Sequence, residues 1–417
     1  MDHPNIMKLY ETYSDTNNFY LIMEALVGGD LFSQLDEVQD VFPKRLPEQK
    51  VAAIMRQAIR AVRWLHDHNI VHGDLKPENF ALAAKKPAGQ TPAKLIDFGF
   101  AERCKQQESI RLCRNDVYTA PEASPSLGQY GWASDVWSLG VMMYALLAGV
   151  PPFNAGSGIY RLRFEHKGWW PCQEVSPNAK ALLNGILKRR PEDRLTARDC
   201  AKHPWVSQWV ASVPPPYRQA GFFGQSQVEM LSRLVQFYSS DTTSLAKAAW
   251  QVVVLHLTES QLKACKDLFL YIDVEGNGYI SSAQLRKVFS EAKIDDGALE
   301  SVLQEVELLR DDRLGYTEFM TAVLEKQEFD TEQHCAAAFK AFDRFESNMV
   351  DREALEESLG VTAEMATKIL DEAFAGGLPR GSSGVDMETF KHLFNRVTTP
   401  SGQMARRTTS QGSGEEL

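Results

Sequence analysis

The 417-residue sequence lacks several features that would place it in a specialised class of protein. Its six cysteines are scattered and form no CxxC pair, which argues against a disulfide framework and is typical of a reducing intracellular compartment. It also lacks an excess of positive charge, because the formal net charge is -10 and no basic stripe for nucleic acid is present. We therefore expect a cytoplasmic protein that does not bind nucleic acid.

Targeting and membrane signals are missing as well. The first residues, MDHPNIMKLYE, contain no apolar segment of a signal peptide, and Asp2 stands where N-myristoylation needs glycine. The uncharged run of residues 136–153 could be mistaken for a membrane span, but it contains Gly140 and Gly149 and ends in two prolines. This run predicts a helix buried in a large domain, and we expect no transmembrane segment.

What is present is typical of a globular protein. Apolar residues make up 44% and charged residues 24% of a chain whose length predicts two or three domains. NIMKLYETY and NFYLIMEAL predict two strands joined by a turn, and EQKVAAIMRQAIRAVRWLHDHN predicts a long amphipathic helix. From residue 228 the pattern is nearly all helical, and the polar, Gly/Ser-rich segment 398–417 predicts disorder.

Three short motifs stand in order in the first half. HGDLKPEN (72–79) is followed by DFG (97–99) and then by APE (120–122). As an ordered set, together with DVWSLG and PEDRLTARDCAKHPW, they resemble the eukaryotic protein kinases over residues 1–206. The resemblance implies an α+β fold, with a mainly helical large lobe and a remnant of the β small lobe. It also implies ATP, Mg²⁺ and transfer of phosphate to Ser or Thr of protein substrates.

The resemblance assigns roles in catalysis to four residues. Asp74 would orient the target hydroxyl and accept its proton, and Lys76 would stabilise the moving phosphoryl group. Asn79 and Asp97 would supply oxygen ligands to Mg²⁺. Each residue alone is more often a turn former, but their spacing as a set indicates a phosphoryl-transfer loop. Asp135 would accept hydrogen bonds from the backbone of this loop.

Other residues would set nucleotide and substrate specificity. By resemblance, Met23 would gate the adenine pocket, and the backbone at Glu24 and Leu26 would bond the base. Asp30 and Glu78 are acidic where kinases that prefer basic substrates recognise Arg upstream of the target Ser or Thr. For these two carboxylates a solvated surface position stays open as the alternative.

Two positions depart from the family pattern. Gly73 replaces the Arg that in many kinases pairs with a phosphate on the activation loop, which predicts activity without such phosphorylation. Replacement of Ser109 and Thr119 by Ala is therefore expected to leave activity intact. Asn115 replaces a Thr that bridges the catalytic Asp and Lys, and its different reach predicts that Asp74 is held less well.

The kinase pattern is complete in the large lobe only. Glu122 and Arg194 are expected to form its buried structural ion pair. The sequence begins with DHPNIMKLYE, which matches the fourth strand of a kinase small lobe. The Gly-rich loop, the lysine of the third strand and the glutamate of the small-lobe helix are absent from it. We expect either an incomplete sequence or a degenerate kinase that serves as a binding surface.

The second half contains helix–loop–helix patterns, of which LFLYIDVEGNGYISSAQLRKVF (268–289) carries a recognisable EF-hand loop. Gly278 supplies its sharp turn. The twelfth position holds Gln284 instead of the bidentate Glu, so Ca²⁺ affinity is expected to be on the order of 10⁻⁴ M or poorer. The predicted ligands are Asp273, Glu275, Asn277, Tyr279 through its carbonyl, and Gln284.

Three further units, 307–319, 343–355 and 378–390, keep fewer ligands. Leu309 and Phe345 stand at the third position of the first two, where an oxygen ligand belongs. These units predict structural hands that pack in pairs and hold no ion well.

The segment between the halves, 228–262, resembles the junction of the calcium-dependent protein kinases, a family of plants and alveolate protists. That family joins a Ser/Thr kinase to a junction helix and four EF-hands. By analogy the junction helix would block the substrate groove until Ca²⁺ binds, whereas an amphipathic helix packed permanently on a neighbour is the alternative. The domains implied are 1–206 kinase, 207–258 linker and junction, 259–326 and 327–397 EF-hand pairs, and the tail.

Three hypotheses follow from the sequence. The first is a Ser/Thr kinase of this family with weakened Ca²⁺ control. The second is a catalytically impaired pseudokinase or scaffold with structural EF-hands. The third is a pure Ca²⁺ sensor, which the poor loops disfavour.

Overall fold

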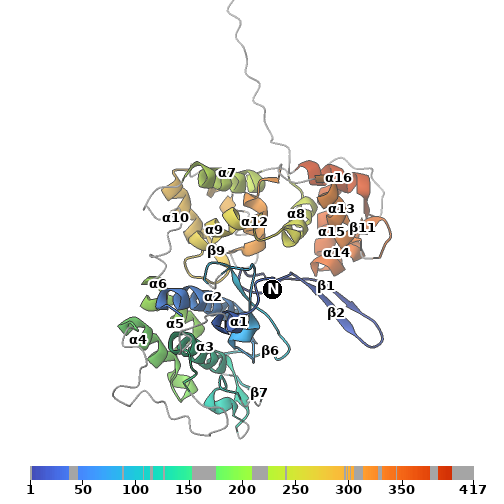
Figure 1. Cartoon of the computed structure of the whole chain (residues 1–417). Helices are drawn as coiled ribbons and strands as arrows, with labels where there is room; N and C mark the ends of the chain where they lie inside the picture. The colour runs from blue at the N-terminus through green and yellow to red at the C-terminus, as the bar shows by residue number, and fades with distance from the viewer. Residues whose placement is uncertain are drawn as a thin grey trace, which may run out of the picture. The chain divides into compact units, whose positions relative to one another are not determined.

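Figure 1 shows the chain as a computed structural model. The structure describes residues 2–36, 46–86, 89–106, 108–112, 116–124, 127–152, 175–208, 224–239, 242–294, 297, 299–300, 302–304, 313–326, 331–343, 345–375 and 384–396. Residues 209–223 of the predicted linker and the whole predicted tail lie outside these residues. The chain divides into two compact units: unit 1 is Met1–Val228, Thr258–Asp295 and Val306–Met320, and unit 2 is Glu229–Leu257, Asp296–Glu305 and Thr321–Leu417.

Unit 1 is mainly helical, and every sheet among the described residues has two strands. Its short 3₁₀ turns each begin with proline, which is favoured at the first helical position: Pro77–Asn79, Pro121–Ala123 and Pro191–Asp193. The first part of the unit contains β1 (Leu9–Ser14), β2 (Phe19–Met23), α1 (Leu31–Asp36), α2 (Glu48–Asp67), β3 (Ile70–Val71), β4 (Phe80–Leu82), β5 (Ala93–Leu95), β6 (Glu102–Arg103), β7 (Ile110–Arg111), β8 (Gln129–Tyr130), α3 (Trp132–Ala148), α4 (Pro177–Ile186), α5 (Ala197–Lys202) and α6 (Pro204–Gln208).

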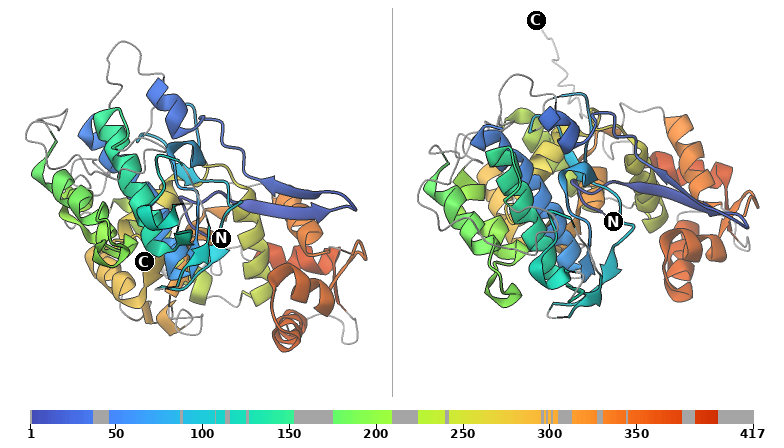
Figure 2. Two further views of the ribbon diagram at one scale, coloured as in Figure 1. Left: turned by 90° about the horizontal axis from the view of Figure 1, so that it is seen from below. Right: turned by 60° about the horizontal axis from the view of Figure 1, so that its bottom comes forward.

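The two strands predicted at the start of the chain form an antiparallel hairpin, β1–β2. The hairpin projects from the rest of unit 1 as an extended arm in both views of Figure 2. All five residues of β2, Phe19–Met23, are exposed, and Phe19 is 88% exposed. A strand packed on one face would alternate buried and exposed side chains. Neither face of β2 is therefore covered by the described residues, whereas Tyr10 and Glu11 of β1 are half-buried.

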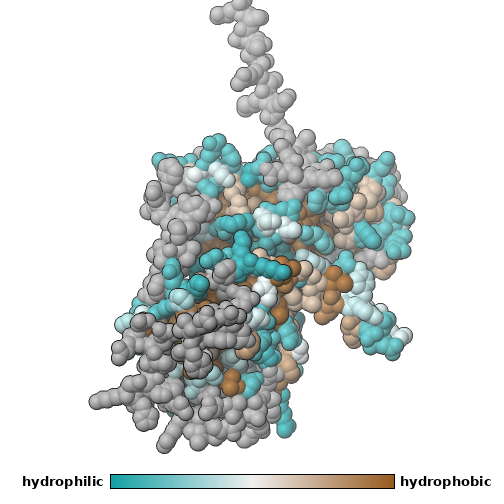
Figure 3. Space-filling view, in the orientation of Figure 1, coloured by the Kyte–Doolittle hydropathy of each residue, from teal (hydrophilic) through white to brown (hydrophobic). Residues whose placement is uncertain are grey.

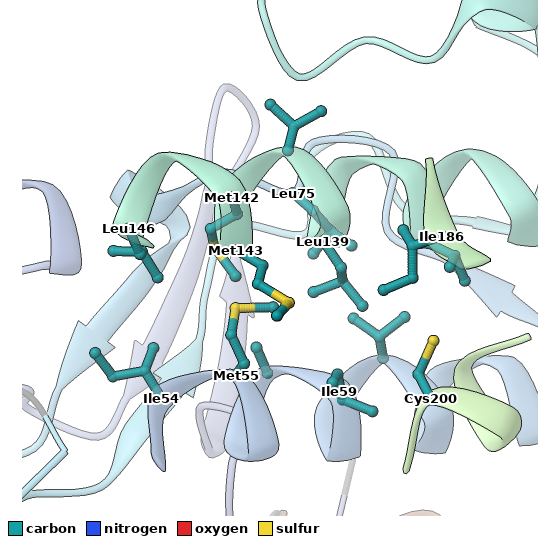
Figure 4. Packing of buried hydrophobic residues seen from close by; sticks show 14 of the residues in the cluster. Ile54, Met55, Ile59, Leu75, Leu139, Met142, Met143, Leu146, Ile186 and Cys200 are labelled. Atoms are coloured by element: carbon teal, nitrogen blue, oxygen red, sulfur yellow. The ribbon is translucent and has the colours of Figure 1, made fainter. Parts of the chain in front are cut away.

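The core of unit 1 lies between α2 and α3. Apolar residues of α2 recur three or four positions apart and are buried, as the predicted amphipathic helix requires: Val51, Ile54, Met55, Ala58, Ile59, Val62 and Leu65. Figure 4 shows Met55 of α2 and Met143 of α3 pointing toward one another, with Ile59 and Leu139 beside them. Burial of each such side chain contributes roughly 1.5–3 kcal/mol, which fixes the helix that leads into the catalytic loop.

Helix α3 contains residues 136–148 of the uncharged run whose burial was predicted. Its residues from Ser134 to Ala148 are buried, and it ends at Gly149, whose φ of +75° is the left-handed conformation that closes many helices. Gly140 lets α4 approach closely, because an added Cβ there would collide with Ile186. In the described part of the chain, no helix has both the length and the apolarity needed to cross a membrane.

Unit 1 also contains the first predicted EF-hand and part of the second. Strand β9 follows the first loop and pairs antiparallel with β10, so that Ile280 faces Leu314. Phe269 packs edge-on against Tyr316 and Phe319 across this pair. The elements are α9 (Lys263–Ile272), β9 (Tyr279–Ser281), α10 (Ser282–Ala292), β10 (Arg313–Gly315) and α12 (Tyr316–Val323).

Unit 2 contains the predicted junction and the second pair of hands. Strands β11 and β12 pair antiparallel, as the loops of paired EF-hands do. The second half of the chain is thus helical with short paired strands, as predicted. Its elements are α7 (Gln225–Ser239), α8 (Ser244–His256), α13 (Thr331–Phe342), β11 (Met349–Asp351), α14 (Arg352–Leu359), α15 (Ala363–Ala375), β12 (Gly384–Asp386) and α16 (Met387–Arg396).

Both junction helices make contacts within unit 2. Helix α8 packs against α13, α15 and α16, and Trp250 stacks on Phe394 with ring centroids 4.6 Å apart. Ser244 at the start of α8 donates to Glu372 of α15 (2.6 Å). The side chain of Arg233 in α7 donates to the carbonyl of Val323 (2.8 Å). These contacts show α7 and α8 packed on neighbouring residues of unit 2, and the autoinhibitory role of the junction stays a prediction.

Candidate active site

A buried aspartate holds the backbone of the predicted catalytic loop. Asp135, in the first turn of α3, is 0% exposed, and its carboxylate accepts the amides of His72 (2.9 Å) and Gly73 (3.2 Å). Tyr130 Oη also donates to it (2.8 Å), and His66 Nε2 lies 3.0 Å away. Burial alone would raise the pKa of Asp135, but the hydrogen bond and charge of His66 hold that pKa below its ordinary value. The hydrogen bonds expected of Asp135 are therefore present.

Three of the predicted catalytic side chains meet directly. Lys76 Nζ lies 2.8 Å from Oδ2 of Asp74, and Nδ2 of Asn79 donates to the same oxygen (3.1 Å) and to the Asp74 carbonyl (2.6 Å). Asp74 is 6% exposed, while the side chain of Lys76 is 29% exposed. Two donors thus fix the direction of one buried carboxylate, which is the positioning that proton transfer from a bound hydroxyl requires.

Asp97 lies at the same end of the β4–β5 hairpin as Asn79. The strands pair antiparallel from Phe80↔Leu95, and the amide of Ile96 donates to the carbonyl of Asn79 (2.9 Å). Asp97 is exposed and has a φ of +58°, a left-handed conformation that Asp tolerates better than most residues. Its Oδ1 accepts the amide of Gly99 (3.2 Å). The hairpin therefore brings the two predicted Mg²⁺ ligands to one edge.

Two oxygen-bearing side chains at this edge suit Mg²⁺. That ion commonly takes one or two protein groups and completes its shell with phosphate oxygens and water. Among the residues that the structure describes, no three His, Cys, Asp or Glu side chains gather into a metal site. The pair of Asn79 and Asp97 fits an ion brought by a nucleotide better than an ion held by the protein alone.

The predicted adenine-binding segment follows β2. Met23, the last residue of β2, is 41% exposed, and Leu26 is half-buried. The amide of Glu24 donates to the carbonyl of Lys8 (3.1 Å), and its carboxylate accepts the amide of Lys8 (2.7 Å). Both carboxylate oxygens of Glu24 bond Nζ of Lys94 (2.9 and 2.7 Å). The segment is therefore tied to β5, the strand that leads to Asp97.

Sequence reasoning missed Lys94 and the charges around it. Lys94 is 2% exposed and also pairs with Glu259 (2.7 Å), which pairs with Lys266 (2.9 Å). Burial opposes ionisation of Glu259, but Lys266 and Lys94 overcome it and lower the pKa of Glu259 to about 2. Burial lowers the pKa of Lys266 to about 8 against the pull of Glu259. The sequence signal that could have indicated a buried charge is the position of Lys94 between the apolar residues Ala93 and Leu95 in a short strand.

The buried ion pair predicted for the large lobe is present. Nη1 and Nη2 of Arg194 lie 2.6 and 2.7 Å from the two carboxylate oxygens of Glu122. The Arg194 side chain is 0% exposed and stacks over Trp137, with the guanidinium 4.8 Å from the ring centroid. This bidentate geometry belongs to the structural frame and touches no predicted catalytic group.

Of the two positions that depart from the family pattern, Gly73 and Asn115, the structure describes only Gly73. Gly73 has a φ of +83°, and an added Cβ would lie 2.7 Å from the carbonyl oxygen of Phe100. A residue with a side chain would be strained there, so the glycine has a local steric reason. Asn115 lies outside the described residues.

The two activation-loop hydroxyls also differ. Ser109 is exposed. Thr119 is 5% exposed, donates to Asp116 Oδ1 (2.9 Å) and accepts the Asp116 amide (3.1 Å). Loss of the Thr119 hydroxyl would therefore disturb the loop itself, which the sequence did not show.

The two acidic residues assigned to substrate recognition also have different surroundings. Asp30 caps the start of α1, because its Oδ1 accepts the amide and the hydroxyl of Ser33 (2.6 and 2.9 Å). Glu78 is half-buried, and its Oε2 is buried without a hydrogen-bond partner among the described residues. Of the two, Glu78 is the one with an unsatisfied carboxylate oxygen among the described residues.

The first EF-hand loop has the expected backbone. Gly278 has a φ of +80°, and the carboxylate of Asp273 accepts the amides of Asn277 (3.1 Å) and Gly278 (3.0 Å). Oδ1 of Asn277 accepts the amide of Tyr279 (3.0 Å). The loop is thus closed by its own side chains around Asp273, which is 1% exposed.

Two of the predicted Ca²⁺ ligands are engaged elsewhere. Oε1 of Gln284 accepts the amide of Ser281 (2.8 Å) in the capping box of α10. The carboxylate of Glu275 pairs with Arg63 of α2 (3.1 Å). The side chains of this loop, as they are arranged, fit Ca²⁺ poorly.

The other loops contain mainly internal hydrogen bonds. In the second, Glu318 accepts the amide of Gly315 (2.8 Å), whereas Leu309 lies outside the described residues. In the third, Asp343 accepts the amide of Asn348 (2.8 Å), and Phe345 is 58% exposed. These contacts favour structural hands.

Comparison with known proteins agrees with the geometry. A family model described as "Protein kinase domain" matches residues 1–206. Calcium-dependent protein kinase 22 of Arabidopsis thaliana is 28% identical over 97% of this chain and 82% of its own length. Calcium-dependent protein kinase 34 of the same plant is 30% identical over 85% of this chain and 66% of its length. Calcium-dependent protein kinase 11 of Oryza sativa subsp. japonica is 28% identical over 100% of this chain and 70% of its length.

Residues 1–206 are therefore a protein kinase domain, and by family the chain is a protein Ser/Thr kinase. Over most of its length it is a relative of the calcium-dependent protein kinases, at about 30% identity.

Proposed function

We propose that the protein transfers the γ-phosphoryl group of ATP to Ser or Thr hydroxyls of protein substrates. The observation that carries the proposal is the buried Asp74 carboxylate, fixed between Lys76 and Asn79 on a loop that Asp135 anchors. Phosphoryl transfer depends on positioning and charge neutralisation, and this arrangement supplies the first.

Each residue of the candidate site has a separate role in the proposed reaction. Backbone groups of Glu24 and Leu26 would bind the adenine, and Asn79 and Asp97 would hold the Mg²⁺ that accompanies the phosphates. The ion would neutralise phosphate charge. Asp74 accepts a hydrogen bond from the substrate hydroxyl, orients its oxygen and takes its proton, while Lys76, next to that carboxylate, faces the transferred group.

We also propose that substrates have Arg upstream of the target residue. The support is Glu78, whose buried Oε2 has no partner among the described residues. A guanidinium would satisfy such an oxygen with a charge-assisted bond. The protein is proposed to act in the cytoplasm, where the free, buried cysteines Cys104, Cys200, Cys265 and Cys335 stay reduced.

Calcium control is the last part of the proposal, and the names of the relatives suggest it. The first EF-hand loop is the candidate site, because it keeps Asp273, Asn277 and the Tyr279 carbonyl. Control is weak, because Glu275 and Gln284 have other partners and two fewer oxygens reach an ion.

The test is phosphate incorporation from labelled ATP with Mg²⁺ into a Ser peptide with Arg upstream. Asp74→Asn is expected to lower the rate by about 10²–10⁴, the usual contribution of a general base. Glu192→Gln, which removes an exposed carboxylate in the same lobe, is the control and should change the rate less than about twofold. Equal rates for the wild type and Asp74→Asn would reject the proposed role of Asp74.

A scaffold function is the second candidate, and one surface favours it. The exposed side chains of β1 and β2 form an apolar surface, seen as brown and tan atoms near the base of the hairpin in Figure 3. Apolar surface of this kind commonly marks an interaction site. Under this function the full chain would bind no ATP, which separates the two candidates.

A further inference from the structure

One face of α2 lies against the first EF-hand loop, and both belong to unit 1. Figure 1 shows the chain between α9 and β9 next to α2. Three of the residues involved, Arg60, Arg63 and Trp64, are three to four positions apart and share one face of α2, and the fourth, His68, is the C-cap of the helix. A predicted metal loop is therefore in contact with two cationic side chains.

Arg63 contacts the loop most closely. Its Nη1 donates to the carbonyl oxygen of Glu275, and its Nη2 lies 3.1 Å from Oε2 of the same residue. Arg63 is 2% exposed. The planar guanidinium thus binds both the main chain and the carboxylate of the third loop position, a two-point contact that a point charge such as a lysine amine could not make.

Arg60 binds the first loop position. Its Nη2 donates to the carbonyl oxygen of Asp273 (3.2 Å), and the pKa of Arg60 is lowered by burial, a cost that the charge of Asp273 partly offsets. A Cβ on Gly276 would lie 2.6 Å from Nε of Arg60. The glycine therefore provides room for this guanidinium as well as a φ of +65°.

The far end of the loop packs on the next turn of α2. A Cβ on Gly278 would lie 2.8 Å from Cδ1 of Trp64, and Nε2 of His68 lies 2.9 Å from the hydroxyl of Tyr279. Trp64 and His68 stack, with ring centroids 3.8 Å apart. The contact thus runs along the loop from position one to position seven.

We propose that Arg60 and Arg63 form an arginine clamp that holds the first EF-hand loop on the kinase domain in place of Ca²⁺, and that Arg63 competes with Ca²⁺ for Glu275. A guanidinium placed on the third position supplies positive charge to the loop from the protein itself. Docking of this EF-hand then requires no Ca²⁺. The inference deepens the weak calcium control proposed above and rests on it only for the competition.

The clamp also predicts how calcium binding would affect the contact between the loop and α2. Arg63 would have to release the Glu275 carboxylate before that carboxylate could serve as a Ca²⁺ ligand, so calcium binding would weaken the contact between the loop and α2. Reciprocally, the clamp lowers calcium affinity by the same factor. Calcium would thus detach this hand, and its absence would leave the hand docked.

The first experiment uses the unaltered protein. Hydrogen exchange is followed on the amides of residues 276–281 in excess EGTA. The clamp predicts slow exchange without Ca²⁺, because the loop is closed and packed. Fast exchange of the whole loop in EGTA, as in a mobile metal-free loop, would overturn the docking part of the proposal.

The second experiment compares calcium titrations by calorimetry. Arg63→Gln is expected to bind Ca²⁺ about fivefold more tightly than the wild type, the factor that corresponds to about 1 kcal/mol for a partly exposed ion pair. Arg198→Gln is the control: Arg198 and Arg63 both pair with Asp67 (2.9 and 3.5 Å), but Arg63 also bonds Glu275 directly (3.1 Å), whereas Arg198 acts on Glu275 only through charge at longer range. Arg198→Gln is therefore expected to change calcium affinity less than Arg63→Gln. If Arg63→Gln does not fold, Arg60→Gln is used instead and its loop amides are expected to exchange faster in EGTA.

The outcomes separate the two proposals. An unchanged calcium affinity in Arg63→Gln, or no heat from either protein up to millimolar Ca²⁺, overturns the competition. Heat from Arg63→Gln and none from the wild type supports the clamp and rejects calcium binding at this loop in the natural protein. If Arg60→Gln exchanges as slowly as the wild type, the clamp is wrong.

Discussion

Glu259 gives the sharpest test of the charge network that links the first EF-hand to the predicted adenine-binding segment. Its carboxylate lies 2.7 Å from Nζ of Lys94 and 2.9 Å from Nζ of Lys266. Replacement by Gln keeps the shape and removes the charge. Lys94 then keeps only Glu24, and Lys266 loses its carboxylate partner inside the protein.

The magnitude follows from the pKa of Glu259. That pKa is about 2 in the folded protein against an ordinary 4.5, a difference of about 2.5, and each pKa unit corresponds to ~1.36 kcal/mol. A carboxyl group whose pKa is lower in the folded than in the unfolded protein stabilises the fold at pH values above its unfolded pKa. This stabilisation is lost as the pH falls toward the folded pKa. We expect Glu259→Gln to cost about 2–3 kcal/mol at pH 7, because the side chain is 30% exposed, and roughly half as much at pH 3.

The assay is urea unfolding at pH 7, 4 and 3, followed by tryptophan fluorescence. All tryptophans except Trp250 precede residue 229, so the signal reports mainly unit 1. Asp267→Asn, which breaks the exposed pair with Lys263, is the control and should cost less than about 1 kcal/mol at each pH. The reasoning would be refuted if Glu259→Gln lowered the free energy of unfolding only slightly at pH 7. It would also be refuted if the loss were equal at pH 7 and pH 3.

Three further changes test other parts of the structure. Glu122→Gln is expected to destabilise by about 3–5 kcal/mol in thermal unfolding, because it leaves the buried Arg194 unpaired; a loss under 1 kcal/mol would contradict this. Gly73→Ala should cost at least about 2 kcal/mol, and more than Gly29→Ala, which has a similar φ of +76° but no atom nearer than 3.9 Å to the new Cβ. Ser109→Ala should leave the rate of phosphate transfer unchanged, since Gly73 offers no cation for a phosphate; a large loss would restore a phosphorylation switch.

The local parts of this fold could be predicted from the sequence. Hydrophobic spacing of 3.6 predicts α2, and two β-rich runs around a polar turn predict the β1–β2 hairpin. The contact among Asp74, Lys76 and Asn79 was predictable as well, because they lie within six residues and one short loop brings them together. Such features depend on interactions between near neighbours in the chain.

Contacts across long sequence separations could not be predicted. Arg63 and Glu275 are 212 positions apart. The amphipathic pattern of α2 does not identify which of its basic side chains contacts a loop from another domain. The same holds for Lys94 and Glu259. The sequence therefore predicts a loop that binds calcium weakly. The structure adds that the side chain of Arg63 already pairs with Glu275, the residue at the third ligand position.

The central claim is that Asn79 and Asp97 hold the magnesium of a bound nucleotide beside Asp74. The most direct measurement is calorimetric titration of the full chain with ATP, with and without Mg²⁺, for the wild type and Asp97→Asn. We predict that ATP binds the wild type at least about tenfold more tightly with Mg²⁺, and that Asp97→Asn loses this difference. Binding that ignores Mg²⁺, or no binding of ATP at all, would contradict the account.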